Sequence, residues 1–179
     1  MPRAILNKVY TIGHSTRSFG EFALLLKKYG VNQLIDVRSL PRSRHNPQFN
    51  KPLLGKKLRS RGIGYRHMKG LGGLRHALKD SLNTGWQNLS FRGYADYMQT
   101  AAFSANLARL IDLARKKHLA LMCAEALPWR CHRSLIADAL TARGLPVVHI
   151  FSATSSRPHR LTPFARVRGG KVTYPAVAR

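Results

Sequence analysis

Acidic residues are scarce in this sequence. Only seven of its 179 residues are Asp or Glu, against 31 Lys and Arg, so the formal net charge is +24. Repulsion between so many like charges opposes compaction unless a polyanion or bound anions neutralise part of it. The balance therefore predicts nucleic acid or another polyanion as a partner. A basic coat that only keeps the protein in solution remains the alternative.

Cysteines and long hydrophobic runs are also scarce. Cys123 and Cys131 are too few for a disulfide framework, and in a reducing compartment both are expected as thiols. No apolar run reaches the roughly 18 residues of a membrane-spanning helix. The start, MPRAILNKVYTIG, lacks the pattern of a secretion signal. We therefore expect a cytoplasmic protein, while the oligomeric state stays open.

Several cofactor motifs are missing. Without a GxGxxG or Walker loop, a dinucleotide or nucleoside triphosphate would lack its usual phosphate cradle. Cys123, Cys131 and His132 are possible zinc ligands, but CxxC and HExxH spacings are absent, so the zinc signal is weak. The spacing from either cysteine to the following arginines does not fit a thiol-phosphatase loop. The cofactor is therefore left undefined.

Apolar runs and helical repeats alternate along the chain. The apolar runs predict strands at 8–12, 33–37, 63–68, 118–125 and 147–151. The helical repeats predict helices at 18–29 and 52–61 and a last helix from Cys131 to Gly144. Between them, two consecutive helices are predicted from Tyr94 onward, and Thr100 caps the second. Strands alternating with helices imply right-handed crossovers. The expected fold is α/β, a Rossmann-like, mainly parallel sheet with helices on both faces.

The chain is expected to form one domain with a tail. Residues 1–152 form the predicted α/β core, in which the segment from KGLGG (69–73) to about residue 92 is irregular. Residues 153–179 are rich in proline and arginine and form a basic arm. This arm contains a small β-hairpin at 166–174, which turns at Gly169 and Gly170. We expect the arm to pack on the same domain.

Polar side chains gather where the predicted strands end. They are His14 and Ser15 after the first strand, Asp36 and Arg38 at the second, and Cys123, Glu125 and the WRCHR segment (129–133) after the fourth. Ligands of open parallel sheets bind beyond these carboxyl ends, because the strand-to-helix loops meet there. The sequence therefore predicts the functional site at this edge.

Two of the seven acids, Asp36 and Glu125, lie at such strand ends. Paired carboxylates can serve as general acid and base on water, with His14 or His132 as proton partner, or can hold a divalent metal ion. Alternatively, they only pair with nearby arginines and hold loops in place. Both interpretations stay open at this point.

The two cysteines differ in their expected roles. Cys123 closes the apolar run LALMC and is expected as a small buried hydrophobe. Cys131 is predicted in the first turn of a helix, where the helix dipole and neighbouring arginines favour a nucleophilic thiolate. However, Cys131 repeats at helical spacing with Leu135 and Ala139, which is also the pattern of a core residue.

Arginines and aromatic residues predict a phosphate or nucleic-acid site near the same edge. The candidates are Ser15, Arg38, Arg42, Arg44, Tyr65, Trp129, Arg130 and Arg133. Arginine side chains bind phosphate by charge-assisted hydrogen bonds, and aromatic faces stack on bases. A solvated basic surface with its aromatics in the core is the alternative.

The motifs TIGHSTRS, IDVRSLPRSRHNPQFN, GIGYRHMKGLGG, FRGYADYM, LMCAEALPWRCHR and LTPFARVRGGKVTYP together resemble the bacterial family called domain of unknown function 488 (DUF488). The resemblance covers nearly the whole chain. It implies a single α/β domain with these motifs at one end of the sheet, and it implies no particular reaction or catalytic residue.

Three functions are compatible with these features. The first is an enzyme, hydrolytic in type, that acts on nucleic acid or a nucleotide with carboxylate acid–base chemistry in an arginine-rich cleft. The second is a nucleic-acid-binding protein without chemistry. The third is a thiol-dependent enzyme or redox sensor that uses Cys131.

Overall fold

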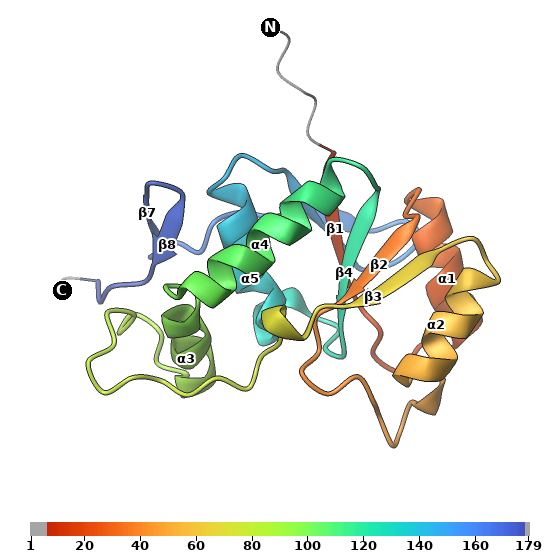
Figure 1. Cartoon of the computed structure of the whole chain (residues 1–179), viewed down its shortest axis with the longest axis horizontal. Coiled ribbons are helices and arrows are strands. Elements are labelled where there is room, and N and C mark those ends of the chain that lie inside the picture. Colours follow the sequence, from red (N-terminus) through yellow and green to blue (C-terminus); the bar gives the residue numbers. More distant parts are fainter. Residues whose placement is uncertain (1–6, 178–179) are drawn as a thin grey trace, which may run out of the picture.

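The computed structural model describes residues 7–177 and contains a six-stranded sheet in the order β3-β2-β4-β1-β5-β6 (Figure 1). Its strands are β1 (Val9–Gly13), β2 (Gln33–Asp36), β3 (Gly64–His67), β4 (Leu119–Cys123), β5 (Val147–Ile150) and β6 (Ser156–Pro158). All neighbours from β3 to β5 pair in parallel, and only β6 is antiparallel, to β5. The predicted α/β fold with a mainly parallel sheet is confirmed.

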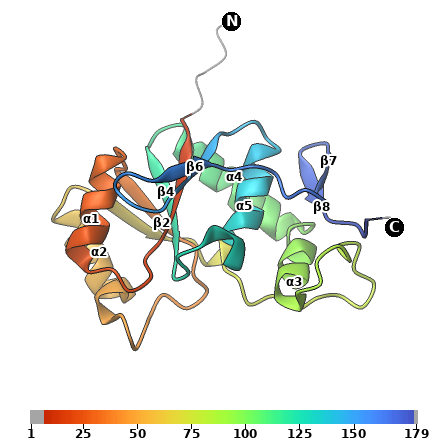
Figure 2. The ribbon, with the colours of Figure 1, turned by 180° about the vertical axis from the view of Figure 1, so that it is seen from behind.

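The helices cover both faces of the sheet (Figures 1 and 2). They are α1 (Phe19–Lys28), α2 (Lys51–Arg59), α3 (Leu89–Tyr97), α4 (Ala101–Ala114) and α5 (Arg133–Thr141), with the short 3₁₀ turns η1 (Pro47–Phe49), η2 (Lys69–Leu71) and η3 (Pro128–Arg130). Among the described residues, no helix is long and apolar enough to cross a membrane.

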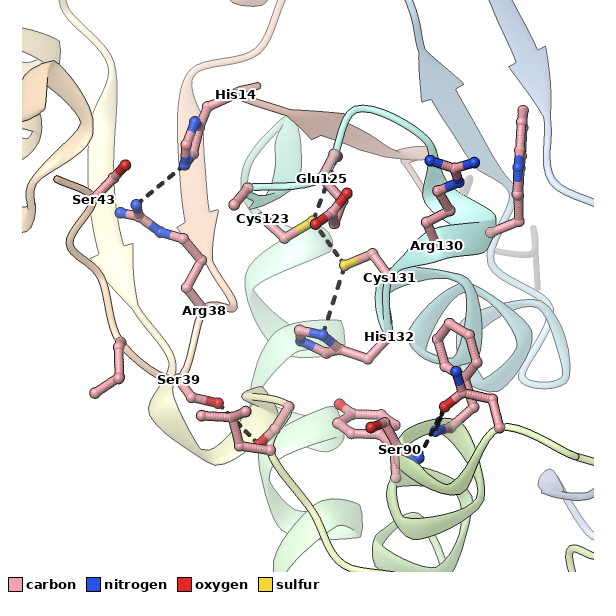
Figure 3. A pocket seen from close by; sticks show the side chains of 18 of the residues that line it. His14, Arg38, Ser39, Ser43, Ser90, Cys123, Glu125, Arg130, Cys131 and His132 are labelled. Carbon is pink, nitrogen blue, oxygen red and sulfur yellow. Dashed lines mark hydrogen bonds between the residues drawn. The ribbon is translucent and has the colours of Figure 1, made fainter. Parts of the chain in front are cut away.

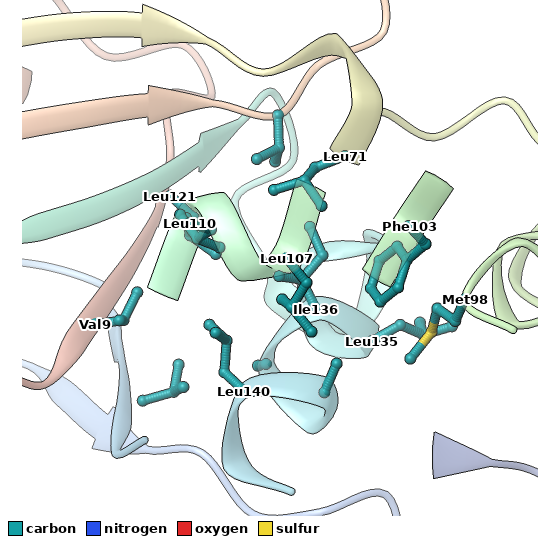
Figure 4. Packing of buried hydrophobic residues seen from close by; sticks show 14 of the residues in the cluster. Val9, Leu71, Met98, Phe103, Leu107, Leu110, Leu121, Leu135, Ile136 and Leu140 are labelled. Carbon is teal, nitrogen blue, oxygen red and sulfur yellow. The ribbon is translucent and has the colours of Figure 1, made fainter. Parts of the chain in front are cut away.

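Each face of the sheet has its own apolar core. On one face, Phe22 of α1 and Leu54 of α2 pack in a cluster with Ile12 of β1. On the other, Leu107 of α4 and residues of α5 pack in a larger cluster, shown in Figure 4. Strands β1, β2, β4 and β5 are buried on both faces, which explains why each was visible as a short continuous apolar run.

Side-chain caps fix where the helices begin. Ser18 accepts a hydrogen bond from the backbone of Glu21, whose carboxylate accepts one in return, so the predicted capping box begins α1. Thr100 caps α4 as predicted. The first of the two helices expected from Tyr94 begins earlier, at Leu89, because the side chain of Asn88 accepts two backbone hydrogen bonds.

Two further details differ from the sequence prediction. Cys131 does not lie in the first turn of a helix: its backbone is extended, with φ −140° and ψ 148°, and α5 begins only at Arg133. The arm predicted at 153–179 also supplies β6, which adds an edge strand to the main sheet.

The C-terminal hairpin is confirmed. Strands β7 (Arg166–Arg168) and β8 (Lys171–Thr173) pair antiparallel, and Gly169 and Gly170 both take positive φ values, as a tight two-residue hairpin turn requires. Val172 and Tyr174 belong to the apolar cluster formed with α4 and α5. The hairpin thus packs on the α/β core.

The order of the strands opens a crevice between β1 and β4. These two strands are neighbours, but the chain leaves β1 for α1 on one face and leaves β4 for α5 on the other. Diverging loops leave space beyond the carboxyl ends of such strands, which is where ligands bind in open α/β sheets.

Candidate functional site

A cleft of about 660 Å³ lies at this edge of the sheet (Figure 3). Of the residues predicted for the site, the cleft is lined by His14, Arg38, Arg42, Glu125, Trp129, Arg130, Cys131 and His132. Cys123, which the sequence assigned to the core, lines it as well. The loops after β1, β2 and β4 therefore meet at one site.

Five predicted residues are not among those that line the cleft: Ser15, Asp36, Arg44, Tyr65 and Arg133. Asp36 is fully buried. Its carboxylate accepts hydrogen bonds of 2.9 and 2.7 Å from the guanidinium of Arg38 and one of 2.6 Å from the hydroxyl of Tyr65. Asp36 and Tyr65 therefore hold Arg38 in position at the wall of the cleft.

His14 is fixed beside Arg38. Its ring stacks on Phe49 with centroids 4.3 Å apart, and its Nδ1 lies 2.8 Å from the carbonyl oxygen of Ser15. Nδ1 must therefore carry the proton, which leaves Nε2 to accept from Arg38 at 3.4 Å. Burial lowers the pKa of His14 below its usual value of 6.5, so the ring favours its neutral form.

The two cysteines are in direct contact, with their sulfur atoms 2.7 Å apart. Burial raises the pKa of the Cys123 thiol well above its usual value, so this group stays protonated. The hydrogen bond from Cys123, together with His132 and Arg133, lowers the pKa of Cys131 well below its usual value despite burial. In the neutral pair Cys131 donates to Cys123. When Cys131 loses its proton, the thiol of Cys123 becomes the donor and stabilises the Cys131 thiolate.

His132 is oriented toward the same sulfur. Its Nε2 lies 2.9 Å from the carbonyl oxygen of Val37, so Nε2 must carry a proton and donate it. Nδ1 then faces Sγ of Cys131 at 3.6 Å. A thiol, an imidazole and a carbonyl group that orients the imidazole thus lie in one cluster, and such an arrangement can activate a cysteine as a nucleophile.

Arg133 lies behind the cysteines rather than in the cleft. Only 1% of it is exposed, and its guanidinium donates to the carbonyl oxygen of Glu125 at 2.7 Å. None of the ion pairs in residues 7–177 involves Arg133. Its backbone N–H donates to Sγ of Cys131 at 3.5 Å. A buried positive charge without a carboxylate partner favours a thiolate nearby.

A buried chain of hydrogen bonds continues from Arg133, and sequence reasoning missed it. Arg133 reaches Oγ1 of Thr11 at 3.4 Å, Thr11 contacts Nδ1 of His149 at 2.7 Å, and Nε2 of His149 contacts Nδ1 of His159 at 2.9 Å. His159 then donates to Asp138 at 2.7 Å. The sequence signal that could have predicted this chain is the presence of the polar residues Thr11 and His149 inside two otherwise apolar strands.

Gly13 allows the loop after β4 to close over the end of β1. A Cβ at Gly13 would overlap the backbone carbonyl group of Glu125 and Cα of Ala126. Only glycine therefore permits this approach, and it places Glu125 next to the end of β1. No local sequence pattern predicts this contact, because it joins segments more than a hundred residues apart.

The remaining cleft residues are open to solvent. Glu125, Arg130 and Arg42 are exposed, and Trp129 is 55% exposed. Glu125 lines the cleft and Asp36 does not, so the two carboxylates are not paired across it. Within residues 7–177, no group of three or more His, Cys, Asp or Glu side chains is arranged to hold a metal ion.

Comparison with known proteins identifies the family. No match was found among curated proteins or among solved structures. The family model described as Domain of unknown function DUF488 matches residues 18–140, which is most of the chain and includes Arg38, both cysteines and His132. The resemblance seen in the sequence motifs is confirmed, and the chain belongs to the DUF488 family.

Proposed function

We propose that the protein is a thiol-dependent enzyme in which Cys131 is the nucleophile and an anionic substrate, of the nucleic-acid or nucleotide class, is held by the arginines of the cleft. The observation that carries this proposal is the contact of Sγ of Cys131 with Cys123 at 2.7 Å and with Nδ1 of His132 at 3.6 Å, inside the cleft.

The cluster supports a complete nucleophilic cycle. The proton of Cys131 passes to Nδ1 of His132, and the carbonyl group of Val37 keeps the ring oriented. The thiolate attacks an electrophilic centre of the substrate and forms a covalent bond to sulfur, while the leaving group takes the proton from His132. Water, deprotonated by the same ring, then breaks the bond to sulfur and restores the thiolate.

The charge of the cleft favours a negatively charged substrate. Arg38, Arg42 and Arg130 line it, and Glu125 is the only acidic side chain among the described residues that do. Arg38 is held rigidly by Asp36, so little conformational entropy is lost when it binds an anion. Phosphate groups are suitable anions because guanidinium groups bind them with charge-assisted hydrogen bonds.

The carboxylate mechanism predicted from the sequence receives less support. Both oxygens of Asp36 already accept hydrogen bonds from Arg38 or Tyr65, which leaves this group to position Arg38. Glu125 is exposed at the cleft and can still transfer a proton to or from water. Glu125→Gln separates this role from that of the thiol, because it leaves the cysteine pair in place.

Alkylation by iodoacetamide as a function of pH tests the proposal. Cys131 should react with a midpoint well below about 8.5, the ordinary value for a thiol, and peptide mass spectrometry should locate the label. Cys131→Ser should lose the fast reaction. Cys123→Ala should still be labelled at Cys131, with a higher midpoint, which assigns the reactive site to Cys131 and not to Cys123. A wild-type midpoint at or above the ordinary value would overturn the proposal.

A redox role is the second candidate, and the direct contact of two free cysteines favours it. A thiolate attacks a peroxide, which releases water or an alcohol and leaves a sulfenic acid. The neighbouring thiol of Cys123 then condenses with that sulfenic acid to a disulfide and releases water. The same Cys131 thiolate would thus serve either an electrophilic substrate or an oxidant.

A further inference from the structure

A second groove, of about 780 Å³, shares Trp129 with the cleft. We call it the Trp129 groove, and its walls include Trp129, Phe151, Arg157, His159, Arg160 and Phe164. We propose that it binds a single-stranded nucleic acid that enters from the cleft and passes over Trp129. This inference rests on the proposed function and specifies its substrate as a strand rather than a free nucleotide.

Trp129 provides a stacking surface between the two spaces. It lies in η3, immediately before Arg130, and 55% of it is exposed. Its ring lies near that of Phe151, with centroids 6.1 Å apart. A large exposed aromatic side chain on an ordered turn is suited to stack on a base, because every base has an apolar face.

The charge of the groove complements phosphates. Arg157 and Arg160 line it, and none of the described residues in its wall is Asp or Glu. Arg157 belongs to the edge strand β6, all of which is exposed, and its guanidinium lies 5.7 Å from the ring centroid of Phe151. Arginine beside an aromatic ring lets one site contact a phosphate and a base at once.

The two spaces together favour a strand over other polyanions. A nucleotide held by Arg42 and Arg130 in the cleft would leave the Trp129 groove empty, whereas a strand can fill both. In a duplex the faces of the bases are covered by their neighbours, so only an unpaired base can stack on Trp129. An acidic peptide would satisfy the arginines but has no planar group at each repeat for Trp129.

Fluorescence anisotropy with a labelled single-stranded 12-mer of thymidylate tests the inference. Trp129→Ala should weaken binding about tenfold, since stacking contributes about 1–3 kcal/mol per base. The double variant Arg157→Ala with Arg160→Ala should weaken binding. It should also reduce the slope of log affinity against log salt concentration by about one unit or more. The control, Lys116→Ala with Lys117→Ala, removes two exposed charges in the loop before β4 and should bind almost as tightly as the wild type.

Competitors separate the possible ligands. Unlabelled 12-mer should displace the probe at far lower concentration than thymidine monophosphate, a 12-base-pair duplex or polyglutamate. Equal competition by polyglutamate or by the duplex, or unchanged binding in the Trp129 and arginine variants, would overturn the inference. Strand binding and thiol titration are separate measurements on the wild-type protein. If the strand does not bind, the proposal for Cys131 can still be tested by alkylation. If Cys131 has an ordinary pKa, the binding measurement still tests the Trp129 groove.

Discussion

Nε2 of His149 and Nδ1 of His159 lie 2.9 Å apart, in the middle of the hydrogen-bond chain that joins Arg133 to Asp138. The donors can be assigned in order. Asp138 can only accept, so Nε2–H of His159 donates to it and Nδ1 of His159 accepts from Nε2–H of His149. Nδ1 of the neutral His149 then accepts from the hydroxyl of Thr11, which accepts from Arg133. Each link holds the next in orientation, so Asp138 and Arg133 are coupled across the interior.

This chain requires a neutral His149, and it makes stability depend on pH. Burial, with the nearby His159 and Arg133, lowers the pKa of His149 from 6.5 to about 3. The unfolded chain therefore takes up this proton first as the pH falls. The free energy of unfolding should decrease below pH 6.5, by about 1.4 kcal/mol per pH unit, until about pH 3.

Urea denaturation between about pH 7.5 and pH 4.5 measures this slope. His149→Gln should lower stability at neutral pH but flatten the slope, although His14, whose pKa burial also lowers, keeps part of it. His118→Gln alters an exposed histidine and should retain the wild-type slope. An unchanged slope in His149→Gln would show that another group titrates.

The two strand-end carboxylates should behave very differently on substitution. Asp36→Asn leaves the buried guanidinium of Arg38 without its counter-charge, so we expect a loss of about 3–5 kcal/mol in the free energy of unfolding. Glu125→Gln changes an exposed side chain and should alter stability by no more than about 0.5 kcal/mol. Chemical denaturation compares them, and similar losses would contradict the assigned roles.

The thiol of Cys123 should control the acidity of Cys131. Cys123→Ala removes the strongest cause of the lowered pKa, and a hydrogen bond to a charged group contributes about 1.5–3 kcal/mol. The pKa of Cys131 should therefore rise by about one to two units. The pH dependence of alkylation, or of thiolate absorbance in the ultraviolet, measures it. No rise would mean that Cys123 does not donate to this sulfur.

Mild oxidation should join the two cysteines. With their sulfur atoms already in contact, treatment with hydrogen peroxide should give a disulfide between Cys123 and Cys131, two hydrogen masses lighter than the dithiol. Peptide mapping without reduction should locate it, and dithiothreitol should reverse it. Cys123→Ala should instead accumulate the sulfenic acid, which dimedone traps. Peroxide that leaves both wild-type thiols free would exclude the redox candidate.

Much of the fold was predictable because its signals are local. The strands at 33–37 and 147–151 were visible as apolar runs, and the start of α1 as a capping box at Ser18. β6 was missed since its three residues, Ser156–Pro158, include a proline and have no apolar pattern. Only its pairing with β5 makes it a strand.

The candidate site was predictable in place but not in chemistry. The carboxyl ends of parallel strands lie at one edge of the sheet, so the strand pattern alone places His14, Arg38 and Cys123 together there, as the sequence predicted. The sequence did not show that Tyr65 and Arg38 occupy the carboxylate of Asp36, or that Cys131 meets Cys123. These contacts depend on side-chain directions and on how loops return, which have no periodic signature.

The central position of β1 has a consequence for synthesis of the chain. Both neighbours of β1, which are β4 and β5, lie more than a hundred residues further along. A nascent chain therefore carries an unpaired apolar strand until most of it has left the ribosome, and this is when association with other chains competes with folding. A fragment cut at 18–140 would lack this strand and leave β4 with an open edge.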